Sequence, residues 1–288
     1  MEISRKDFLK GALGATCFCL LKPTPVAMAK ESQNRDGVAM LIDVTKCVNC
    51  WWCYAACKEH NHLPETKQPS VEDPPGLSPA VWTTLHPVKK DDKWVSRKNA
   101  CNHCTDAACV EVCPTGALSY NHLGFVQYDK DKCSGCGYCS EACPFGVPQM
   151  EANKVTGVSI MNKCTFCFDR VTNGEQPACA AACTTGAITY GKRTDLITQG
   201  EERVAALRKT NTKASLYGND ELHGLHVMYV LDDSPDVYGL PAEPKVSSSV
   251  MVRDVFRWLA PGLAVAILAG FGLNYLVARR RIKNGEKK

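Results

Sequence analysis

Sixteen of the chain's 18 cysteines fall into four compact groups between residues 47 and 183. Each group opens with CxxC and closes with CxxxC, and only the gap between these two units varies. Disulfide frameworks do not need such repeated gaps, whereas loops that wrap a metal centre do. The cysteines therefore predict ligands of metal clusters rather than a network of disulfides.

The variable gap is two residues in the first and third groups, which is the CxxCxxCxxxC spacing of bacterial ferredoxins. It widens to four residues in the second group and to eleven in the fourth. In the ferredoxin geometry three cysteines hold one 4Fe-4S cluster and the fourth points to a second cluster. In chain order the groups are Cys47, Cys50, Cys53 and Cys57; Cys101, Cys104, Cys109 and Cys113; Cys133, Cys136, Cys139 and Cys143; and Cys164, Cys167, Cys179 and Cys183.

Zinc is the alternative occupant, because paired CxxC units also build tetrahedral sulfur sites. A structural zinc site does not call for a third cysteine at the next two-residue gap, as the first and third groups have. The spacing therefore favours four 4Fe-4S clusters over a zinc-binding structural protein.

The sequence around the cysteines repeats. Residues 113–118 (CPTGAL) recur as residues 183–188 (CTTGAI), and Asp43 and Asp129 each precede a leading cysteine by four residues. Each unit predicts a short strand, a cluster loop and a helical turn closed by glycine. We therefore predict an α+β fold of two ferredoxin-like, double-cluster halves. The inner half holds motifs two and three (residues 101–143), and the outer half holds motifs one and four.

Three side chains inside the cysteine groups invite a role of their own. Trp51 and Trp52 fill one CxxC gap, where packing that shields a cluster is favoured over contact with a catalytic subunit. His103 fills another gap and is a candidate hydrogen-bond donor to cluster sulfur. Residues 63–80 read as a surface loop, with a partner-docking loop as the alternative, and a strand-like segment follows at 80–88.

The chain shows no nucleophile elbow, phosphate loop or dinucleotide fingerprint. An autonomous iron–sulfur enzyme is therefore a weaker hypothesis than an electron-transfer protein. The net charge of +4 resides at the ends: residues 1–29 carry +2 and residues 279–288 carry +5, which leaves −3 for the rest. A mildly acidic body predicts no nucleic-acid partner.

The first 29 residues are a predicted export signal of the twin-arginine type. Residues 4–10 read SRKDFLK, and an apolar stretch with a small-residue cleavage site follows. The pattern resembles Ser/Thr-Arg-Arg-x-Phe-Leu-Lys, with Lys6 in place of the second arginine. An ordinary secretory signal is the alternative. Cys17 and Cys19 lie in the apolar stretch and have no predicted role in the mature protein.

Residues 259–277 contain no charged side chain and would form a helix about 30 Å long, which matches the hydrocarbon core of a bilayer. We predict one transmembrane helix at 256–278, joined to the body by a linker at 246–255; a buried core helix is the alternative. The tail at 279–288 begins with three arginines, so the positive-inside bias places it in the cytoplasm. The cluster domain, residues 30–245, would then face the periplasm from the bacterial inner membrane.

Several segments together resemble one protein family over most of the predicted mature chain. They are residues 41–44 (LIDV), 81–83 (VWT), 143–145 (CPF), 163–171 (KCTFCFDRV), 176–179 (QPAC), 226–231 (HVMYVL) and 239–241 (GLP). They are similar to the four-cluster iron–sulfur subunits that accompany molybdopterin oxidoreductases, and most of all to the beta subunit of membrane-bound formate dehydrogenase of the N type. One departure is the export signal, which those beta subunits typically lack and periplasmic hydrogenase iron–sulfur subunits carry.

The resemblance implies a subunit that is not catalytic alone. It would carry electrons from a catalytic molybdopterin subunit to an integral membrane cytochrome b or quinone-reactive subunit, and one helix would anchor it in lipid. The iron–sulfur subunit of a periplasmic NiFe hydrogenase, or of another molybdopterin oxidoreductase, is the alternative.

The resemblance also implies crossed ligation, in which the last cysteine of each group serves the cluster of its partner group. Site one would comprise Cys47, Cys50, Cys53 and Cys183; site two Cys101, Cys104, Cys109 and Cys143; site three Cys133, Cys136, Cys139 and Cys113; and site four Cys164, Cys167, Cys179 and Cys57. Electrons would pass through the sites in the order one, four, two, three.

Overall fold

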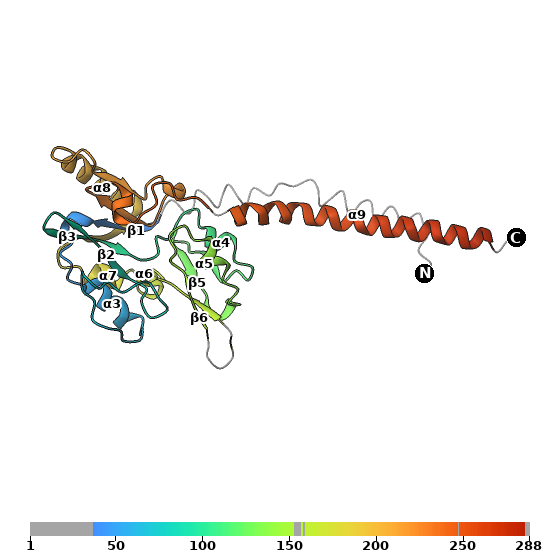
Figure 1. Ribbon diagram of the computed structural model, residues 1–288, viewed down its shortest axis with the longest axis horizontal. Helices are drawn as coiled ribbons and strands as arrows, with labels where there is room; N and C mark the ends of the chain where they lie inside the picture. The colour runs from blue at the N-terminus through green and yellow to red at the C-terminus, as the bar shows by residue number, and fades with distance from the viewer. Residues whose placement is uncertain (1–36, 153–156, 158, 247, 286–288) are drawn as a thin grey trace.

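The computed structural model describes residues 37–152, 157, 159–246 and 248–285. The predicted export signal, with Cys17 and Cys19, lies outside the described residues. Figure 1 shows a body built from short strands and helices, and one long C-terminal helix that projects from it.

The body is organised around a four-stranded sheet with the order β8-β1-β10-β9. Its strands are β1 (Val38–Asp43), β8 (Ile188–Lys192), β9 (Ser215–Tyr217) and β10 (Val227–Leu231). β1 pairs antiparallel with β8 and parallel with β10, while β9 pairs antiparallel with β10. The cysteine-free segment at 226–231 thus completes the sheet that leads into the first cysteine group.

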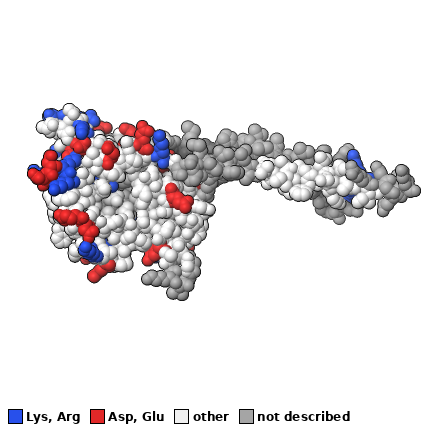
Figure 2. Space-filling view, in the orientation of Figure 1, with Lys and Arg blue, Asp and Glu red and all other residues white. Residues whose placement is uncertain are grey.

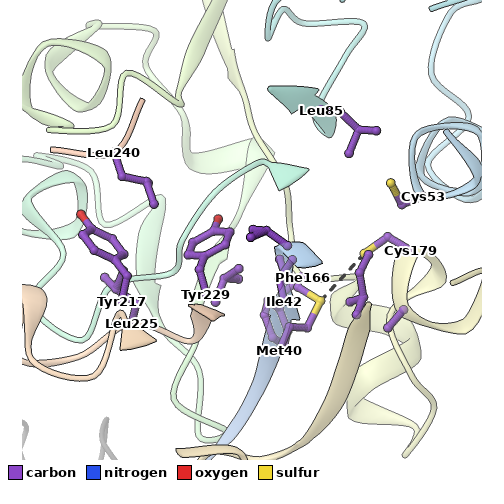
Figure 3. Close-up of a cluster of buried hydrophobic side chains, with 14 of the residues drawn as sticks. Met40, Ile42, Cys53, Leu85, Phe166, Cys179, Tyr217, Leu225, Tyr229 and Leu240 are labelled. Atoms are coloured by element: carbon purple, nitrogen blue, oxygen red, sulfur yellow. Dashed lines mark hydrogen bonds between the residues drawn. The ribbon is translucent and has the colours of Figure 1, made fainter. Parts of the chain in front are cut away.

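Alternating residues of β1 face opposite sides of this sheet, as the two-residue period of a strand requires. Ala39 and Leu41 pack under helix α8 (Arg193–Arg208) together with Leu196. Met40 and Ile42 face the cysteine groups and belong to a core with Phe166, Cys53 and Cys179 (Figure 3). One face of the sheet is therefore covered by a helix, and the other supports the candidate cluster sites.

Every cysteine group follows a short strand and contains or precedes a short helix, as the repeat predicts. The strands are β1, β3 (Lys93–Asn99), β5 (Val126–Tyr128) and β7 (Ser159–Asn162), and the helices are α3 (Trp52–His60), α4 (Ala108–Glu111), α5 (Tyr138–Ala142), α6 (Phe168–Thr172) and α7 (Ala178–Ala181). Gly116 and Gly186 close the turns with φ of +67° and +66°, a conformation that favours glycine. The strand–loop–helix prediction is confirmed.

Three hairpins complete the sheet structure of the described residues. They pair β2 (Thr84–Lys90) with β3, β4 (Leu118–Tyr120) with β5, and β6 (Gln149–Ala152) with β7. Short 3-10 turns lie at Val44–Lys46, Lys130–Lys132, Glu221–His223 and Pro235–Tyr238.

The strand predicted at residues 80–88 begins later than expected, because β2 starts at Thr84. Upstream, Ser78 and Val81 form an isolated bridge, and the indole nitrogen of Trp82 donates a hydrogen bond to Pro79 O at 3.0 Å. These local contacts hold a turn in place of the first part of the strand.

Helix α9 (Ser248–Gly285) is longer than the predicted membrane span, because it begins inside the predicted linker and continues into the basic tail. Its apolar window, Gly262–Arg280, spans 19 residues with a mean hydropathy of 1.5, and none of it is buried in the body. The alternative of a buried core helix is therefore wrong, and α9 is long and apolar enough to cross a membrane.

Helix α9 leaves the body beside the inner half. Val246, just before α9, packs against Ala108, Val112 and Ala142, which belong to the region of α4 and α5. Figure 1 shows α4 and α5 next to the start of α9, with α3 at the far side of the body.

Candidate iron–sulfur cluster sites

Strand register brings the first cysteine of one group opposite the last cysteine of another. Ile42 pairs with Ile188, and Cys47 lies five residues after Ile42 while Cys183 lies five residues before Ile188. The same antiparallel register, continued beyond the ends of β1 and β8, therefore places Cys47 across from Cys183.

The inner half repeats this geometry. Leu118 pairs with Tyr128, and Cys113 and Cys133 lie five residues beyond this pair on the two strands. In each half, one antiparallel strand pair therefore brings the first cysteine of one group close to the last cysteine of its partner group.

The site-one cysteines surround a common cavity. Cys47, Cys50, Cys53 and Cys183 line this cavity together. The backbone N–H of Ile188 donates a hydrogen bond to Cys183 Sγ at 3.4 Å. Buried Cys179, from the neighbouring site, lies with its Sγ 3.9 Å from Met40 Sδ, the dashed contact in Figure 3.

The site-three cysteines surround a second cavity, which is lined by Cys113, Cys133, Cys136 and Cys139. Gly135 allows the loop to pass close to β7, because a Cβ there would lie 1.9 Å from Ser159 O. Burial raises the pKa of Cys133, but the nearby Tyr128 hydroxyl and the backbone N–H groups of Met161 and Gly135 outweigh it and lower the pKa.

The site-two thiols act on one another electrostatically. Burial raises the pKa of Cys104 well above its usual range, and the neighbouring Cys101, Cys109 and Cys143 thiolates raise it further. A thiol with these neighbours gives up its proton only to a strong positive centre, such as a metal. The structure therefore brings the implied ligand set of site two together.

The site-four thiols show the same relation. Burial raises the pKa of Cys167, and Cys164, Cys179 and Cys57 add to the increase, although a hydrogen bond from Ala178 N at 3.4 Å opposes it. Burial likewise raises the pKa of Cys57 to about 12, with Cys164 as its strongest thiolate neighbour. Cys57, from the first group, thus lies among cysteines of the fourth.

The four sites form a row. Burial is the main reason that Cys53, Cys101 and Cys109 have raised pKa values, and a thiolate of the next site raises each one further. These electrostatic interactions between sites link Cys53 with Cys179, Cys101 with Cys164, and Cys109 with Cys139. The resulting sequence of neighbours is one, four, two, three.

The two ends of this row reach the surface. Among the sixteen described cysteines, Cys50 of site one and Cys136 of site three are exposed, and the others are buried or partly buried. Beside them lie Trp52, 59% exposed, and Tyr138, 53% exposed. The interior sites two and four therefore connect two surface-exposed ends.

The two tryptophans of the first group differ in environment. Trp51 has a φ of +62°, packs against the core and meets Tyr54 edge-on with ring centroids 6.0 Å apart. Trp52, the first residue of α3, faces solvent. The prediction of shielding and packing agrees with Trp51, whereas Trp52 lines the site-one cavity but leaves much of its surface in solvent.

Several buried donors beside the cysteines have no protein partner. Among the described residues, Ser96 Oγ, Lys98 Nζ and both ring nitrogens of His103 are buried without a hydrogen bond to protein. Burying such donors is costly unless an acceptor is supplied. Ser96 and Lys98 line the site-one cavity, where sulfide and thiolate sulfur would serve as acceptors.

His103 is fully buried, and the centroid of its ring lies 4.9 Å from that of Phe166 and 6.0 Å from that of Phe125. Burial, reinforced by Lys163, His226 and Lys98, lowers its pKa well below the usual range. The imidazole is therefore neutral and keeps one N–H that can donate. Donation of a hydrogen bond from this N–H to cluster sulfur stays a prediction.

The described residues contain no group of three or more His, Cys, Asp or Glu side chains arranged to hold a single metal ion. At sites one and three the four cysteines of each implied ligand set line one common cavity. A four-iron cluster bound at its corners needs such a space between the thiols. The donor set and the cavities both fit 4Fe-4S clusters.

The repeated aspartates begin the turns that lead into the cysteine loops. Asp43 accepts hydrogen bonds from Thr45 N at 3.0 Å and from Arg203 Nε at 2.8 Å. Asp129 accepts one from Asp131 N at 3.1 Å. The repeat noted in the sequence is thus a pair of capping residues, and Arg203 also ties α8 to the first loop.

Lys98 and Ser96 were not predicted as site residues. Because lysine is almost never fully buried unless it is paired, a lysine in a sequence is expected at the surface. Nothing in the sequence around Lys98, two residues before Ala100, therefore indicated that its side chain is buried beside a cluster site. The strand pattern of β3 indicates only that Ser96 and Lys98 share a face. Which face points inward is decided by pairing with β2.

Two regions of the chain match the 4Fe-4S dicluster domain, at residues 46–117 and 93–193. The chain therefore contains ferredoxin-like dicluster domains. The matched regions run in chain order, whereas in space the first cysteine group lies with the fourth and the second with the third.

Known proteins are similar over most of the chain. The formate dehydrogenase-O iron–sulfur subunit of Escherichia coli K12 is 40% identical over 241 residues, 79% of this chain and 78% of that protein. The nitrate-inducible formate dehydrogenase iron–sulfur subunit of the same strain is 37% identical over 268 residues, 87% of this chain and 89% of that protein. The hydrogenase-2 operon protein HybA of Escherichia coli O157:H7 is 30% identical over 325 residues, 98% of this chain and 97% of that protein.

The cysteine-lined cavities, the dicluster matches and the extent of these similarities lead to one conclusion. The chain belongs to the family of formate dehydrogenase iron–sulfur subunits and is an electron-transfer subunit of an oxidoreductase complex.

Proposed function

We propose that this subunit holds four 4Fe-4S clusters on the crossed ligand sets of sites one to four. The observation that carries the proposal is the row of sites one, four, two and three, in which each set of four cysteines lines one cavity or interacts electrostatically as a unit. When bound, each cluster would accept and release one electron. The protein's part is to hold the thiolates at fixed positions and to exclude water from the interior sites.

The site-one end would face the catalytic subunit. Trp52 and Val48 are 59% and 64% exposed beside Cys50, and a surface groove extends from Trp52 along residues 58–69. Exposed aromatic side chains of this kind often anchor protein interfaces. By the names of its relatives, the partner would be the catalytic subunit of a formate dehydrogenase, which the family resemblance implies contains molybdenum or tungsten.

The site-three end would face the membrane subunit, a cytochrome b or quinone-reactive protein. Val246 packs against the α4–α5 region, so α9 begins beside the inner half of the body. An anchor at this position would hold Cys136 and Tyr138 toward the membrane and leave site one toward the periplasmic partner.

The proposed topology is a single-pass inner-membrane subunit with a periplasmic cluster domain and a cytoplasmic C-terminus. The support comes from the apolar window Gly262–Arg280, followed by further basic residues in the sequence, and from the export pattern at residues 1–29. On the face in Figure 2, acidic and basic side chains intermingle over the end of the body that carries α8, as on an ordinary solvated surface.

A hydrogenase partner is the second candidate. The observation that favours it is the similarity to the hydrogenase-2 operon protein HybA, which extends over 98% of this chain and so includes the export pattern. Identification of the catalytic subunit that copurifies with the native complex discriminates between the two candidates.

Metal analysis of the purified complex tests the cluster assignment. Four cubane clusters predict about sixteen iron atoms and equal acid-labile sulfide in this subunit, with little zinc. Recovery of about four zinc ions and no sulfide would show that the cysteines form zinc sites instead.

A further inference from the structure

Lys98 is a buried cation with no structural partner. It lies in β3, is 1% exposed, and its ammonium makes no hydrogen bond or carboxylate ion pair within the described part of the chain. Its neighbour Arg97 is also buried but donates a hydrogen bond to Tyr238 O at 2.8 Å. Successive strand residues point to opposite sides, so Arg97 supports the fold while Lys98 faces the cysteines.

Lys98 lies between two cluster sites. It lines the site-one cavity together with Cys53, and it also interacts electrostatically with Cys164 and Cys179 of site four. These are the first two sites of the row that begins at the exposed Cys50. The acidic groups that act on the ammonium are thiols of these two sites and the phenol of Tyr229, which burial keeps neutral by raising its pKa.

A charge in this position acts on the reduced sites more strongly than on the oxidised ones. Each electron that enters a site makes the site more negative, and a fixed cation in a dry interior stabilises the added charge with little screening. Net charge and hydrogen bonds to sulfur are main determinants of cluster potentials. The ammonium can supply both, because its donors have no other acceptor.

We propose that Lys98 is a positioning residue for electron transfer, which raises the reduction potentials of the clusters at sites one and four. It would thereby favour entry of electrons at the exposed end of the row. This inference depends on the ligand assignment proposed above. It concerns a side chain that is not a ligand and that the resemblance to known subunits does not mark.

The test is a redox titration of the intact complex, followed by electron paramagnetic resonance. The variants are Lys98→Met, which removes the charge and the donors; Lys98→Gln, which removes the charge and keeps a donor; and Lys98→Arg, which keeps both. Lys93→Met, on an exposed residue of the same strand, is the matched control.

We expect Lys98→Met to weaken the reduced form of both outer clusters about tenfold each, which lowers their potentials by about 59 mV for a one-electron couple. Lys98→Gln should show most of this shift, because the charge is the larger contribution. Lys98→Arg and Lys93→Met should stay near the wild-type potentials, and the inner clusters should not move.

Iron content of the same samples separates the two levels of the argument. Low iron and sulfide in the wild-type complex would overturn the ligand assignment itself. Full iron with unchanged outer potentials in both neutral variants, or equal shifts in all four clusters, would overturn the role of Lys98 alone. Failure of both neutral variants to retain clusters that Lys98→Arg retains would assign the charge to assembly and would also overturn the proposal.

Discussion

Replacement of Cys183 by serine tests the crossed ligation most directly. In sequence Cys183 closes the fourth group, but in the structure it lines the cavity formed by Cys47, Cys50 and Cys53. The register between β1 and β8 is what places it there. We therefore expect the substitution to damage the cluster of the first group and to spare the other three.

The expected magnitude follows from the number of thiols in the cavity. Loss of one of four ligands either releases the whole cluster or leaves three irons bound. The iron content should then fall from about sixteen per chain to about twelve, or to about fifteen. The inner pair, at sites two and three, lies at the other end of the row and should keep its iron.

Electron paramagnetic resonance of the reduced complex identifies the affected cluster. The spectrum of Cys183→Ser should lose the same signal as Cys47→Ser, which shares its cavity, and differ from that of Cys164→Ser, which shares its sequence group. Cys113→Ser, at the equivalent position of the inner half, is the matched control and should alter the signal that Cys133→Ser alters.

Activity gives an independent measure. A break at the first site should stop quinone reduction, while formate oxidation with an artificial acceptor at the catalytic subunit survives. If Cys183→Ser instead removes only the signal that Cys164→Ser removes, the crossed assignment is wrong, and the register argument fails with it.

Three further outcomes are expected. A reporter fused after Lys288 should be active only in its cytoplasm-dependent form, and activity of a periplasm-dependent reporter there would contradict the topology. Trp52→Ala should weaken binding of the catalytic subunit about tenfold in a titrated pull-down at unchanged iron content, because the exposed indole is positioned as an interface anchor; unchanged affinity would place the interface elsewhere. Asp43→Ala should lower the free energy of unfolding by about 1–3 kcal/mol, because it removes a buried acceptor of several hydrogen bonds. Asp129→Ala, at the more exposed equivalent position, should lower the free energy of unfolding by less than Asp43→Ala does. Equal effects of the two substitutions would refute the argument from burial.

Much of the local structure could be predicted from residue spacing. CxxC and CxxxC units dictate short loops around a cluster, and the apolar residues before each leading cysteine form the predicted strands. The charge-free run near the C-terminus forms one long helix. These features depend on neighbours within a few residues, so local pattern is sufficient to indicate them.

The neighbours of each element could not be predicted in this way. β10 pairs with β1 although more than 180 residues separate them along the chain, and no local pattern indicates that Val227–Leu231 lies beside Val38–Asp43. The C-terminal segment, which contains no cysteine, is therefore part of the platform that supports the first cysteine group. Only the tertiary structure shows this role.

The sequence by itself determined that sixteen cysteines fall into four groups with the spacing of cluster ligands, because such spacing is a local property of the chain. The tertiary structure decided which groups meet, since strand register places Cys183 across from Cys47 and Cys113 across from Cys133. It also decided that Lys98 points between two sites and that Trp52 points to solvent. The direction of a side chain relative to distant elements depends on how strands and helices pack, and that packing is set by contacts far apart in the sequence.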